Sequence, residues 1–304
     1  MRSLRLLIAL LLFPLLGFAW SGGGHYTSTA VTYLYLKKNS PATINKVLEI
    51  LKYHPWYNGK RWNYPMEELI GENRKMGLFL LASMYPDDAK DSAVLVGPGM
   101  TEWHFDYYPF VPAGNAVTGT GPAKPNAEDK ITELLQKIKT EPNGKQRAID
   151  LCWLIHLIED VHQPLHVSSL FDKAHPTGDV GGTQTWVIPM PHQQAQTLHS
   201  YWDGLIMGSL KLSGNYAKNL LADPKYQLDK LPELKKNTTP NAWIKNEGVL
   251  AAREVVYIDG RINGTKKSPT EVPQSYYGSC MTYAERSIVL AGIRVANELS
   301  KALK

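Results

Sequence analysis

The chain has 304 residues, of which 43% are hydrophobic and 20% charged, and a net charge of +5 at pH 7. This composition is that of a globular protein and excludes a disordered or low-complexity chain. A charge this small, without a concentrated basic face, does not indicate a protein that binds duplex nucleic acid.

The first segment, residues 1–19, has the pattern of a secretory signal peptide. A basic start, Met1–Arg5, precedes an apolar run, Leu6–Ala19, which is too short for a membrane span of about 20 residues. Gly17 and Ala19 are small residues placed as a cleavage site requires, so the mature chain is expected to begin at Trp20. The protein is therefore predicted to be secreted or periplasmic, with no membrane span.

Residues 20–304 are expected to form one domain, because their number is large for one core but ordinary for a helical domain with inserted loops, and they contain no internal repeats. Helical periodicity predicts helices at 26–38, 41–53, 66–84, 127–140, 145–162, 194–208, 241–258 and 276–303. Pro41 after Ser40 marks one helix start, and Asn126 is a predicted N-cap. Val111–Ala127 is predicted to be a long loop, and Thr183–Ile188 is the best strand pattern. The fold class is thus all-α: a single mainly helical domain with long loops and at most a small hairpin.

A run of glycines, Gly22–Gly24, separates Trp20 from His25. Either the run is a flexible linker after the signal peptide, or its glycines let the chain fold back so that the free amine and His25 bind one metal ion.

The predicted helix at 145–162 carries ionisable residues in an almost wholly apolar sequence. Between residues 148 and 161 the clearly polar positions are Asp150, His156, Glu159 and Asp160. A helix that is apolar nearly all round is a buried helix, and a buried carboxylate or imidazole is costly unless it is paired or binds metal. His156 and Asp160 are four residues apart and share one helix face, and His166 follows after Pro164.

A second pair, His199 and Asp203, has the same spacing. One such pair alone is more often an ordinary hydrogen bond. Two pairs together with His166 favour a metal centre, and imidazole with carboxylate oxygen suits zinc.

Two cysteines occur, Cys152 and Cys280. In an exported protein they indicate a disulfide between the central and last helices, and the alternative is two buried thiols that act as small apolar residues. Asn237 and Asn263 begin glycosylation sequons, which matter only in a eukaryotic host.

In this order along the chain, these residues resemble the trinuclear-zinc, single-strand-specific nucleases of the S-one/P-one type, which are related to zinc-dependent phospholipase C. The resemblance spans the predicted mature chain and includes the motifs Ala82–Lys90 and Trp103–Phe105, the end Gln163–His166 of the central motif, and the paired Gly181 and Gly182. The matching metal positions are Trp20, His25, Asp87, His104, His156, Asp160, His166, His199 and Asp203.

The resemblance implies three zinc ions. The first would be bound by Asp87, His104, His156 and Asp160. A close neighbour would take the amine and carbonyl of Trp20, His25 and the bridging Asp160, and a third ion would take His166, His199 and Asp203. The family pattern assigns no metal to the remaining histidines, which are expected at the surface or orienting a ligand: His54, His162, His175 and His192.

The resemblance also implies hydrolysis of the P–O3′ bond in single-stranded DNA and RNA, with 5′-phosphorylated products and 3′-nucleotidase activity. Asp87 would orient the attacking hydroxide, and Lys90 would contact a phosphate. Phe105 matches the aromatic residue that stacks on an unpaired base, and Tyr107 is a further candidate for substrate contact. The chain departs from the family at two positions near the substrate, with Tyr107 where the family commonly has Asn or Asp and Thr183 where it often has Asn.

Two other functions stay open. Zinc-dependent phospholipase C uses nearly the same metal set, although its last ligand is usually Glu where this chain has Asp203. A secreted, non-catalytic zinc-binding protein is the other alternative. A structural zinc is normally closed by four protein ligands, whereas His166, His199 and Asp203 leave a position for water or substrate. The expected partners are single-stranded nucleic acid and 3′-nucleotides, with the protein a monomer without a stable protein partner.

Overall fold

The computed structural model describes residues 20, 22–89, 99–190 and 193–304. The predicted signal peptide, Lys90 and His192 lie outside these residues. Among the helices of the described part, none combines the length and the apolar character needed to cross a membrane.

Helices make up most of the described chain. Their bounds are α1 (Gly22–Asn39), α2 (Pro41–Leu51), α3 (Lys60–Asn63), α4 (Gly71–Ala89), α5 (Ala127–Thr140), α6 (Lys145–Asp160), α7 (Pro164–Val167), α8 (Leu198–Asp203), α9 (Ser213–Ala222), α10 (Glu233–Lys236), α11 (Pro240–Trp243), α12 (Val249–Ala251) and α13 (Tyr276–Ala302). Short 3₁₀ turns are η1 (Tyr64–Met66), η2 (Met100–His104), η3 (Pro224–Tyr226) and η4 (Leu228–Lys230), and π-helical turns are η5 (Ile244–Gly248) and η6 (Ala252–Val256).

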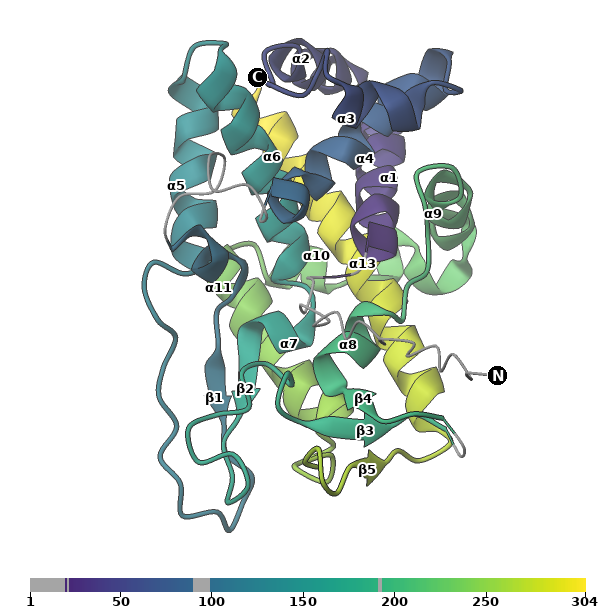
Figure 1. Ribbon diagram of the computed structural model, residues 1–304. Coiled ribbons are helices and arrows are strands. Elements are labelled where there is room, and N and C mark those ends of the chain that lie inside the picture. The colour runs from purple at the N-terminus through teal and green to yellow at the C-terminus, as the bar shows by residue number, and fades with distance from the viewer. Residues whose placement is uncertain (1–19, 21, 90–98, 191–192) are drawn as a thin grey trace, which may run out of the picture.

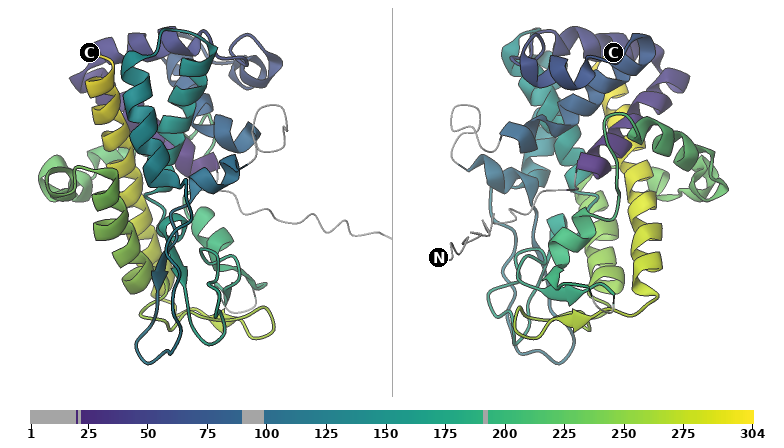
Figure 2. Two further views of the ribbon diagram at one scale, coloured as in Figure 1. Left: turned by 90° about the vertical axis from the view of Figure 1, so that its left-hand side faces the viewer. Right: turned by 45° about the vertical axis from the view of Figure 1, so that its right-hand side comes forward.

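The long helix α13 runs along nearly the whole molecule (Figures 1 and 2). α1, α2, α4, α5 and α6 gather around its upper part, and the helical segment 240–256 lies beside its lower part. α1 packs against α13, α4 and α9, while α6 packs against α5, α4 and α13. The short strands and their loops form the lower end in Figure 1, and α7 and α8 lie between the two regions. The mainly helical single domain expected from the sequence is confirmed.

The strands form two small sheets. β1 (Tyr108–Phe110) pairs in parallel with β2 (Ser168–Leu170). β3 (Trp186–Ile188) pairs antiparallel with β4 (Gln196–Thr197) and in parallel with β5 (Thr270–Glu271). The predicted hairpin is therefore present as β3 and β4, extended by a strand from far along the sequence.

Most long helices agree with the periodicity. The helix at 127–140 has the predicted bounds, and Asn126 forms a capping box with Asp129. The predicted helix at 194–208 is wrong in extent, because Gln196 and Thr197 are extended to pair with β3, and only α8 is helical. The segment 240–256 is helical, as predicted, but includes the two π-helical turns.

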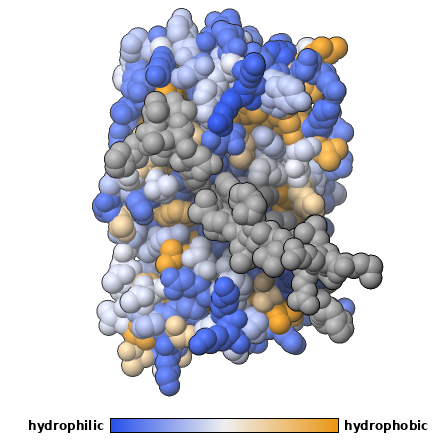
Figure 3. All heavy atoms as spheres, viewed as in Figure 1, coloured by the Kyte–Doolittle hydropathy of each residue, from blue (hydrophilic) through white to orange (hydrophobic). Residues whose placement is uncertain are grey.

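α6 is the buried helix that its composition predicts, since every residue from Leu151 to Asp160 is buried. On the face shown in Figure 3, the coloured hydrophobic side chains are interspersed with hydrophilic ones. The apolar character of α6 thus belongs to the core, and its ionisable groups are held away from water.

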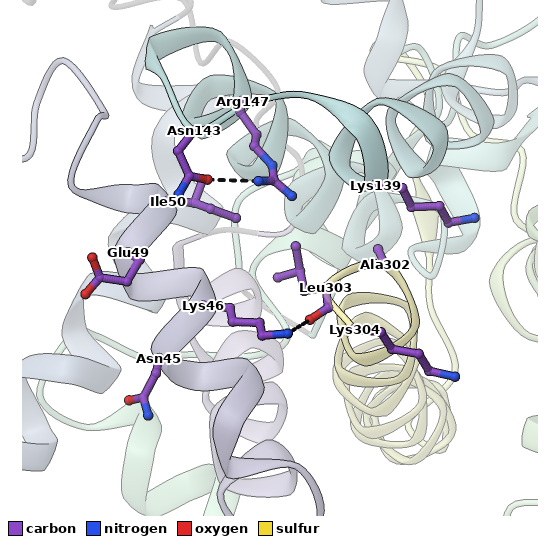
Figure 4. A pocket seen from close by; sticks show the side chains of 10 residues that line it. All are labelled: Asn45, Lys46, Glu49, Ile50, Lys139, Asn143, Arg147, Ala302, Leu303 and Lys304. Atoms are coloured by element: carbon purple, nitrogen blue, oxygen red, sulfur yellow. Dashed lines mark hydrogen bonds between the residues drawn. The ribbon is translucent and has the colours of Figure 1, made fainter.

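A basic pocket lies where α2 and the α5–α6 connection meet the end of α13 (Figure 4). Lys46 Nζ donates a hydrogen bond of 2.6 Å to the carbonyl of Leu303 at the C-cap of α13. Arg147 Nη2 donates to the carbonyl of Ile138 in the last turn of α5. Cations at the C-terminal ends of helices satisfy carbonyls that have no partner within the helix, so these two side chains have a structural role.

Candidate metal centre

In each of the two predicted His–Asp pairs, both side chains lie on the same face of their helix. His156 Nε2 is 3.1 Å from Asp160 Oδ2 on α6, and His199 Nε2 is 3.3 Å from Asp203 Oδ2 on α8. All four side chains are buried. Residues four apart on a helix are thus neighbours in both pairs, as their spacing predicts.

The first cluster gathers around Asp160 at the end of α6. His104 Nδ1, from the 3₁₀ turn η2, lies 2.9 Å from Asp160 Oδ2, and His25 Nε2, from the first turn of α1, lies 3.4 Å from Asp160 Oδ1. Asp87, near the end of α4, lies with its Oδ1 3.6 Å from His156 Nε2. Two triads have ligand atoms within 4.8 Å of one another: His25 with His156 and Asp160, and Asp87 with His104 and His156.

The second cluster contains His166, His199 and Asp203, whose ligand atoms also lie within 4.8 Å of one another. The rings of His166 and His199 are stacked with centroids 5.3 Å apart. Asp160 Oδ1 is 3.6 Å from His166 Nδ1, so the carboxylate of Asp160 lies between the two clusters.

Four of the five histidines are fixed through Nδ1. This nitrogen lies 2.7 Å from the Glu159 carboxylate in His25, 2.7 Å from the Ser83 carbonyl in His156, 3.0 Å from the His104 carbonyl in His166, and 2.7 Å from the Gly181 carbonyl in His199. Oxygen accepts only, so Nδ1 carries the proton and Nε2 presents its lone pair to the site. Metal-binding histidines have this arrangement.

Several buried atoms in the clusters make no hydrogen bond within the described residues: His25 Nε2, Asp160 Oδ1, His166 Nε2 and Asp203 Oδ2. Buried polar atoms normally have a partner, and groups that lack one indicate an ion or water. The donor set of imidazole nitrogens and carboxylate oxygens fits a divalent transition metal such as zinc.

The electrostatics of the clusters favour a bound cation. Burial lowers the pKa of His25, but the negative charges of Asp160 and Glu159 beside it outweigh this and raise the pKa to about 10. The carboxylates thus favour a cation at this place, and a metal ion that binds Nε2 would displace the second proton of this imidazole. Burial would raise the pKa of Asp160, whereas the surrounding histidines, led by His156, hold it well below its usual range. Burial lowers the pKa of His166 to about 3, so its imidazole is neutral, as a ligand must be.

Gly181 and Gly182 have a specific place in the second cluster. Their φ angles are +59° and +78°, and a Cβ on Gly181 would lie 2.3 Å from the carbonyl oxygen of Leu165. Both carbonyls accept hydrogen bonds from His199, one from its ring and one from its backbone N–H. The paired glycines are needed because left-handed backbone must approach Leu165 closely while it orients His199.

An aromatic surface lies beside the second cluster. The half-buried ring of Phe105 is 4.9 Å from the ring of His166 and stacks on Tyr107 at 5.0 Å. Phe105 and Tyr107, both predicted to contact substrate, therefore adjoin the second cluster and each other.

The glycine run before His25 is not a flexible linker, because it forms the first turn of α1. A Cβ on Gly23 would lie 2.3 Å from the carbonyl of Ile206, and one on Gly24 would lie 2.6 Å from the Cβ of Trp20. The side chain of Trp20 is buried and packs against this turn. The small residues thus allow α1 to begin in close contact with its neighbours.

Glu159 is a residue of the site to which sequence reasoning gave no role. It is fully buried and accepts hydrogen bonds from His25 Nδ1 at 2.7 Å and from Thr29 Oγ1 at 2.6 Å. The signal was available, because an acidic residue beside Asp160 in an apolar helix requires a partner. The identity of that partner could not be predicted, since His25 and Thr29 of α1 are far from Glu159 in the sequence.

The other described histidines are not at the surface, where they were predicted as one alternative. His54, His162 and His175 are buried. His162 Nε2 lies 2.6 Å from Nη1 of Arg294 on α13, rather than orienting a candidate ligand. His175 Nδ1 is 3.0 Å from Asp172 Oδ1.

The predicted disulfide is not formed. Cys152 and Cys280 are both free and buried, and burial raises the pKa of each thiol, to about 12 for Cys280. Cys152 has Tyr85 of α4 near it, whereas Cys280 interacts with Tyr276 of its own helix. The alternative reading, two thiols that pack as small apolar residues, describes the structure.

The family model described as S1/P1 nuclease matches residues 20–304. A search among characterised proteins found no match. The matched range contains both clusters and Trp20.

Proposed function

Because the chain belongs to the S1/P1 nuclease family, we propose that it is a zinc-dependent enzyme that cleaves single-stranded DNA and RNA at the P–O3′ bond. The products would carry 5′-phosphates, and 3′-nucleotides would also be hydrolysed. The observation that carries this proposal is the pair of buried His–Asp clusters, of which the first contains Asp160 and the second approaches its carboxylate through His166. The family itself implies nuclease activity and favours it over the phospholipase C alternative.

The donor sets support three zinc positions. Asp87, His104, His156 and Asp160 would hold one ion, and His25 with Asp160 and the terminal group of Trp20 would hold its neighbour. His166, His199 and Asp203 would hold the third. When bound, zinc supplies Lewis-acid chemistry: it makes water a nucleophile near neutral pH and neutralises charge on phosphate.

The protein groups would position the reactants. Asp87 is buried at the end of α4, where its carboxylate could accept a hydrogen bond from the attacking water and orient it toward phosphorus. Asp160 would keep the two clusters in register, because its oxygens face His25, His104 and His166. Lys90, outside the described residues, is proposed as a phosphate contact.

Selection of single strands would come from Phe105. Its half-buried ring lies against His166, so a base stacked on it would place its phosphate near the second cluster. A base can present its face to a side chain only when it has left the duplex stack. Export after cleavage before Trp20 is part of the proposal, because zinc binding by a terminal amine requires that amine to be free.

One assay panel tests the proposal. Purified protein that begins at Trp20 is given single-stranded DNA, single-stranded RNA, duplex DNA, 3′-AMP and phosphatidylcholine, with and without chelator. We expect cleavage of both single strands and of 3′-AMP, and its loss with chelator. Turnover of phosphatidylcholine without nucleic-acid cleavage would overturn the proposal.

A matched pair of variants connects the activity to the clusters. Asp160→Asn removes the charge that two cations would share, and it should abolish cleavage and lower the zinc content. Asp150→Asn changes a buried aspartate on the same helix that is outside both clusters, and it should leave cleavage near wild type. Equal activity in the two variants would contradict the assignment of Asp160.

A further inference from the structure

Between α2 and α4 the chain carries a surface segment that the metal centre does not use. The turn after α2, the short helix α3 and the turn η1 form it, and α3 lies beside α2 and α4 in Figure 1. We call this segment the aromatic–basic corner and define it by Tyr53, Trp56, Tyr57, Lys60, Arg61 and Tyr64.

Large aromatic side chains in the corner are open to solvent. Tyr64 is 79% exposed and Tyr53 is 51% exposed. Lys60, Arg61 and Tyr64 line a surface pocket of about 720 Å³ together with Asn63 and Glu67. Exposed aromatic rings interleaved with cations are the combination by which proteins bind single-stranded nucleic acid without sequence preference, through stacking and phosphate contacts.

The corner is continuous with the metal centre through α4. The ring of Trp56 packs edge-on against Tyr85 with centroids 4.8 Å apart, and Tyr85 precedes Asp87 by two residues. The guanidinium of Arg61 lies 4.8 Å from the centre of the Trp56 ring and donates through Nη1 to the carbonyl of Asp88 at 3.4 Å. The corner therefore lies at the same end of α4 as the candidate ligand Asp87.

The cations of the corner can receive phosphates. Within the described part of the chain, neither Lys60 nor Arg61 forms an ion pair with a carboxylate, and both are exposed. The basic pocket of Figure 4 differs, although it contains Lys46, Lys139, Arg147 and Lys304. Its lining includes no aromatic ring, and Lys46 and Arg147 are bound to helix carbonyls at 2.6 and 2.5 Å. Arg61 also donates to a helix carbonyl, that of Asp88, but at the longer distance of 3.4 Å.

We propose that the aromatic–basic corner is an extended subsite for the single-stranded substrate, where Tyr64 stacks on a base beyond the metal centre and Lys60 and Arg61 bind backbone phosphates. This inference rests on the proposed nuclease function, since it assumes that a polynucleotide occupies the metal centre. It predicts a difference between long and short substrates, because we expect a mononucleotide to bind at the metals without stacking on Tyr64.

The first test compares a long and a short substrate. Tyr64→Leu should raise KM for single-stranded oligothymidylate about tenfold, as expected for the loss of one stacking contact. KM for 3′-AMP should stay at the wild-type value. Tyr64→Phe keeps the ring and should behave as wild type on both substrates. Equal KM values for Tyr64→Leu and Tyr64→Phe on the oligonucleotide would overturn the stacking role.

The second test addresses the cations. The double variant Lys60→Gln with Arg61→Gln should weaken oligonucleotide binding and reduce the slope of log KM against log salt by about 1.4, or about 0.7 for each phosphate contact on a single strand. Lys139→Gln with Lys304→Gln removes the same charge from the pocket of Figure 4 and should leave the slope unchanged. Equal effects of the two double variants would show a general charge effect and overturn the subsite.

Binding is also measured directly, by fluorescence anisotropy with a labelled phosphorothioate oligothymidylate that resists cleavage. If the wild-type protein cleaves nucleic acid and the corner variants bind the strand as tightly as wild type, the subsite is wrong and the nuclease function stands. If the wild-type protein cleaves no nucleic acid, the proposed function fails, and wild-type affinity in the variants would then remove the subsite as well. Unchanged thermal midpoints and zinc contents exclude a folding defect, which matters for Arg61 because it contacts Trp56 and Asp88.

Discussion

Glu159 and Asp160 are consecutive buried acids on α6, yet they face different partners. Asp160 lies among the candidate ligands, whereas Glu159 accepts the Nδ1 proton of His25 and the hydroxyl proton of Thr29. Such a carboxylate fixes the tautomer and the direction of a ligating imidazole and increases its basicity. One helix end thus supplies both a candidate ligand and the group that orients another.

We predict that Glu159→Gln lowers the affinity for the zinc ion bound by His25 about 10- to 100-fold, the usual effect of losing such a partner. Competition with a chromophoric chelator measures the affinity without using the enzymatic activity. Thr29→Val is the control, because it removes the other hydrogen bond of Glu159 and leaves the one to His25 in place. Wild-type zinc affinity in a folded Glu159→Gln protein would contradict the orienting role.

Substitution of Phe105 tests its proposed role in substrate binding. Phe105→Ala should raise KM for single-stranded DNA by the loss of about 1–3 kcal/mol of stacking, while the zinc content stays constant. Phe105→Trp retains an aromatic face and should keep KM near wild type. A fall in the unfolding midpoint of Phe105→Ala with unchanged KM would identify the ring as a packing residue instead.

Among the elements, the end of α2 is joined to α3 and α4 by one buried imidazole. The ring of His54 stacks on Trp62 of α3 at 4.3 Å and meets Tyr85 of α4 edge-on at 4.4 Å. His54 Nδ1 accepts the backbone N–H of Trp56 at 3.2 Å. Burial lowers the pKa of His54 to about 3, so its ring is neutral in the folded protein at physiological pH.

The low pKa of His54 has a consequence for stability. In the unfolded chain this imidazole takes up a proton as the pH falls through about 6.5, and in the folded protein it does so only near 3. The folded state therefore loses stability as the pH falls, by about 2 kcal/mol between pH 7 and pH 5 from this group. His54→Asn keeps an acceptor for the Trp56 N–H and cannot titrate, so urea unfolding should show a smaller loss over this interval. An identical loss in both proteins would assign the pH dependence to other groups.

The elements also show how far sequence reasoning reaches. Long amphipathic or buried helices such as α5 and α6 have several turns of periodicity, and their bounds were predicted closely. Four-residue elements such as α3 offer about one turn, too little for a periodic signal. The predicted helix at 194–208 failed because pairing of Gln196 and Thr197 with β3 overrides a local pattern.

In the metal centre, too, local sequence patterns predict some features and not others. The spacing of His156 and Asp160, or of His199 and Asp203, follows from helix geometry, and burial of α6 follows from composition. The approach of His104 to Asp160 joins residues 56 positions apart, which no local pattern determines. Resemblance to a family supplied that expectation. The stacking of His54 on Trp62 had no comparable signal and was found only in the structure.

At the scale of the whole molecule, the metal centre is assembled from segments spread over most of the chain. α1, α4, η2, α6, α7 and α8 each contribute at least one candidate ligand. The clusters therefore exist only when these segments are packed together, and an ion that binds them stabilises the folded state by mass action. Metal loading and folding are thus expected to be thermodynamically coupled.

The predicted start of the mature chain, Trp20, allows the strictest test of this coupling. Trp20 is buried against the first turn of α1, which carries His25, and the family match also begins at residue 20. If the amine and carbonyl of Trp20 complete the zinc site of His25 and Asp160, that amine must be free. A free α-amine has a pKa of about 8 and loses its proton readily to a metal, whereas an amide nitrogen is a very poor ligand.

We therefore predict that one extra Met before Trp20 lowers the zinc content by about one ion per chain and removes most of the nuclease activity, because the ion it displaces belongs to the pair that Asp160 joins. Zinc per chain and turnover are measured for proteins that begin at Trp20 and at the added Met. His25→Ala, which removes another ligand of the same ion, should give a similar zinc content and serves as the reference. Retention of the signal peptide should act like the added Met, so that export would activate the enzyme. Equal zinc and equal rates with and without the added residue would show that the terminus is not a ligand.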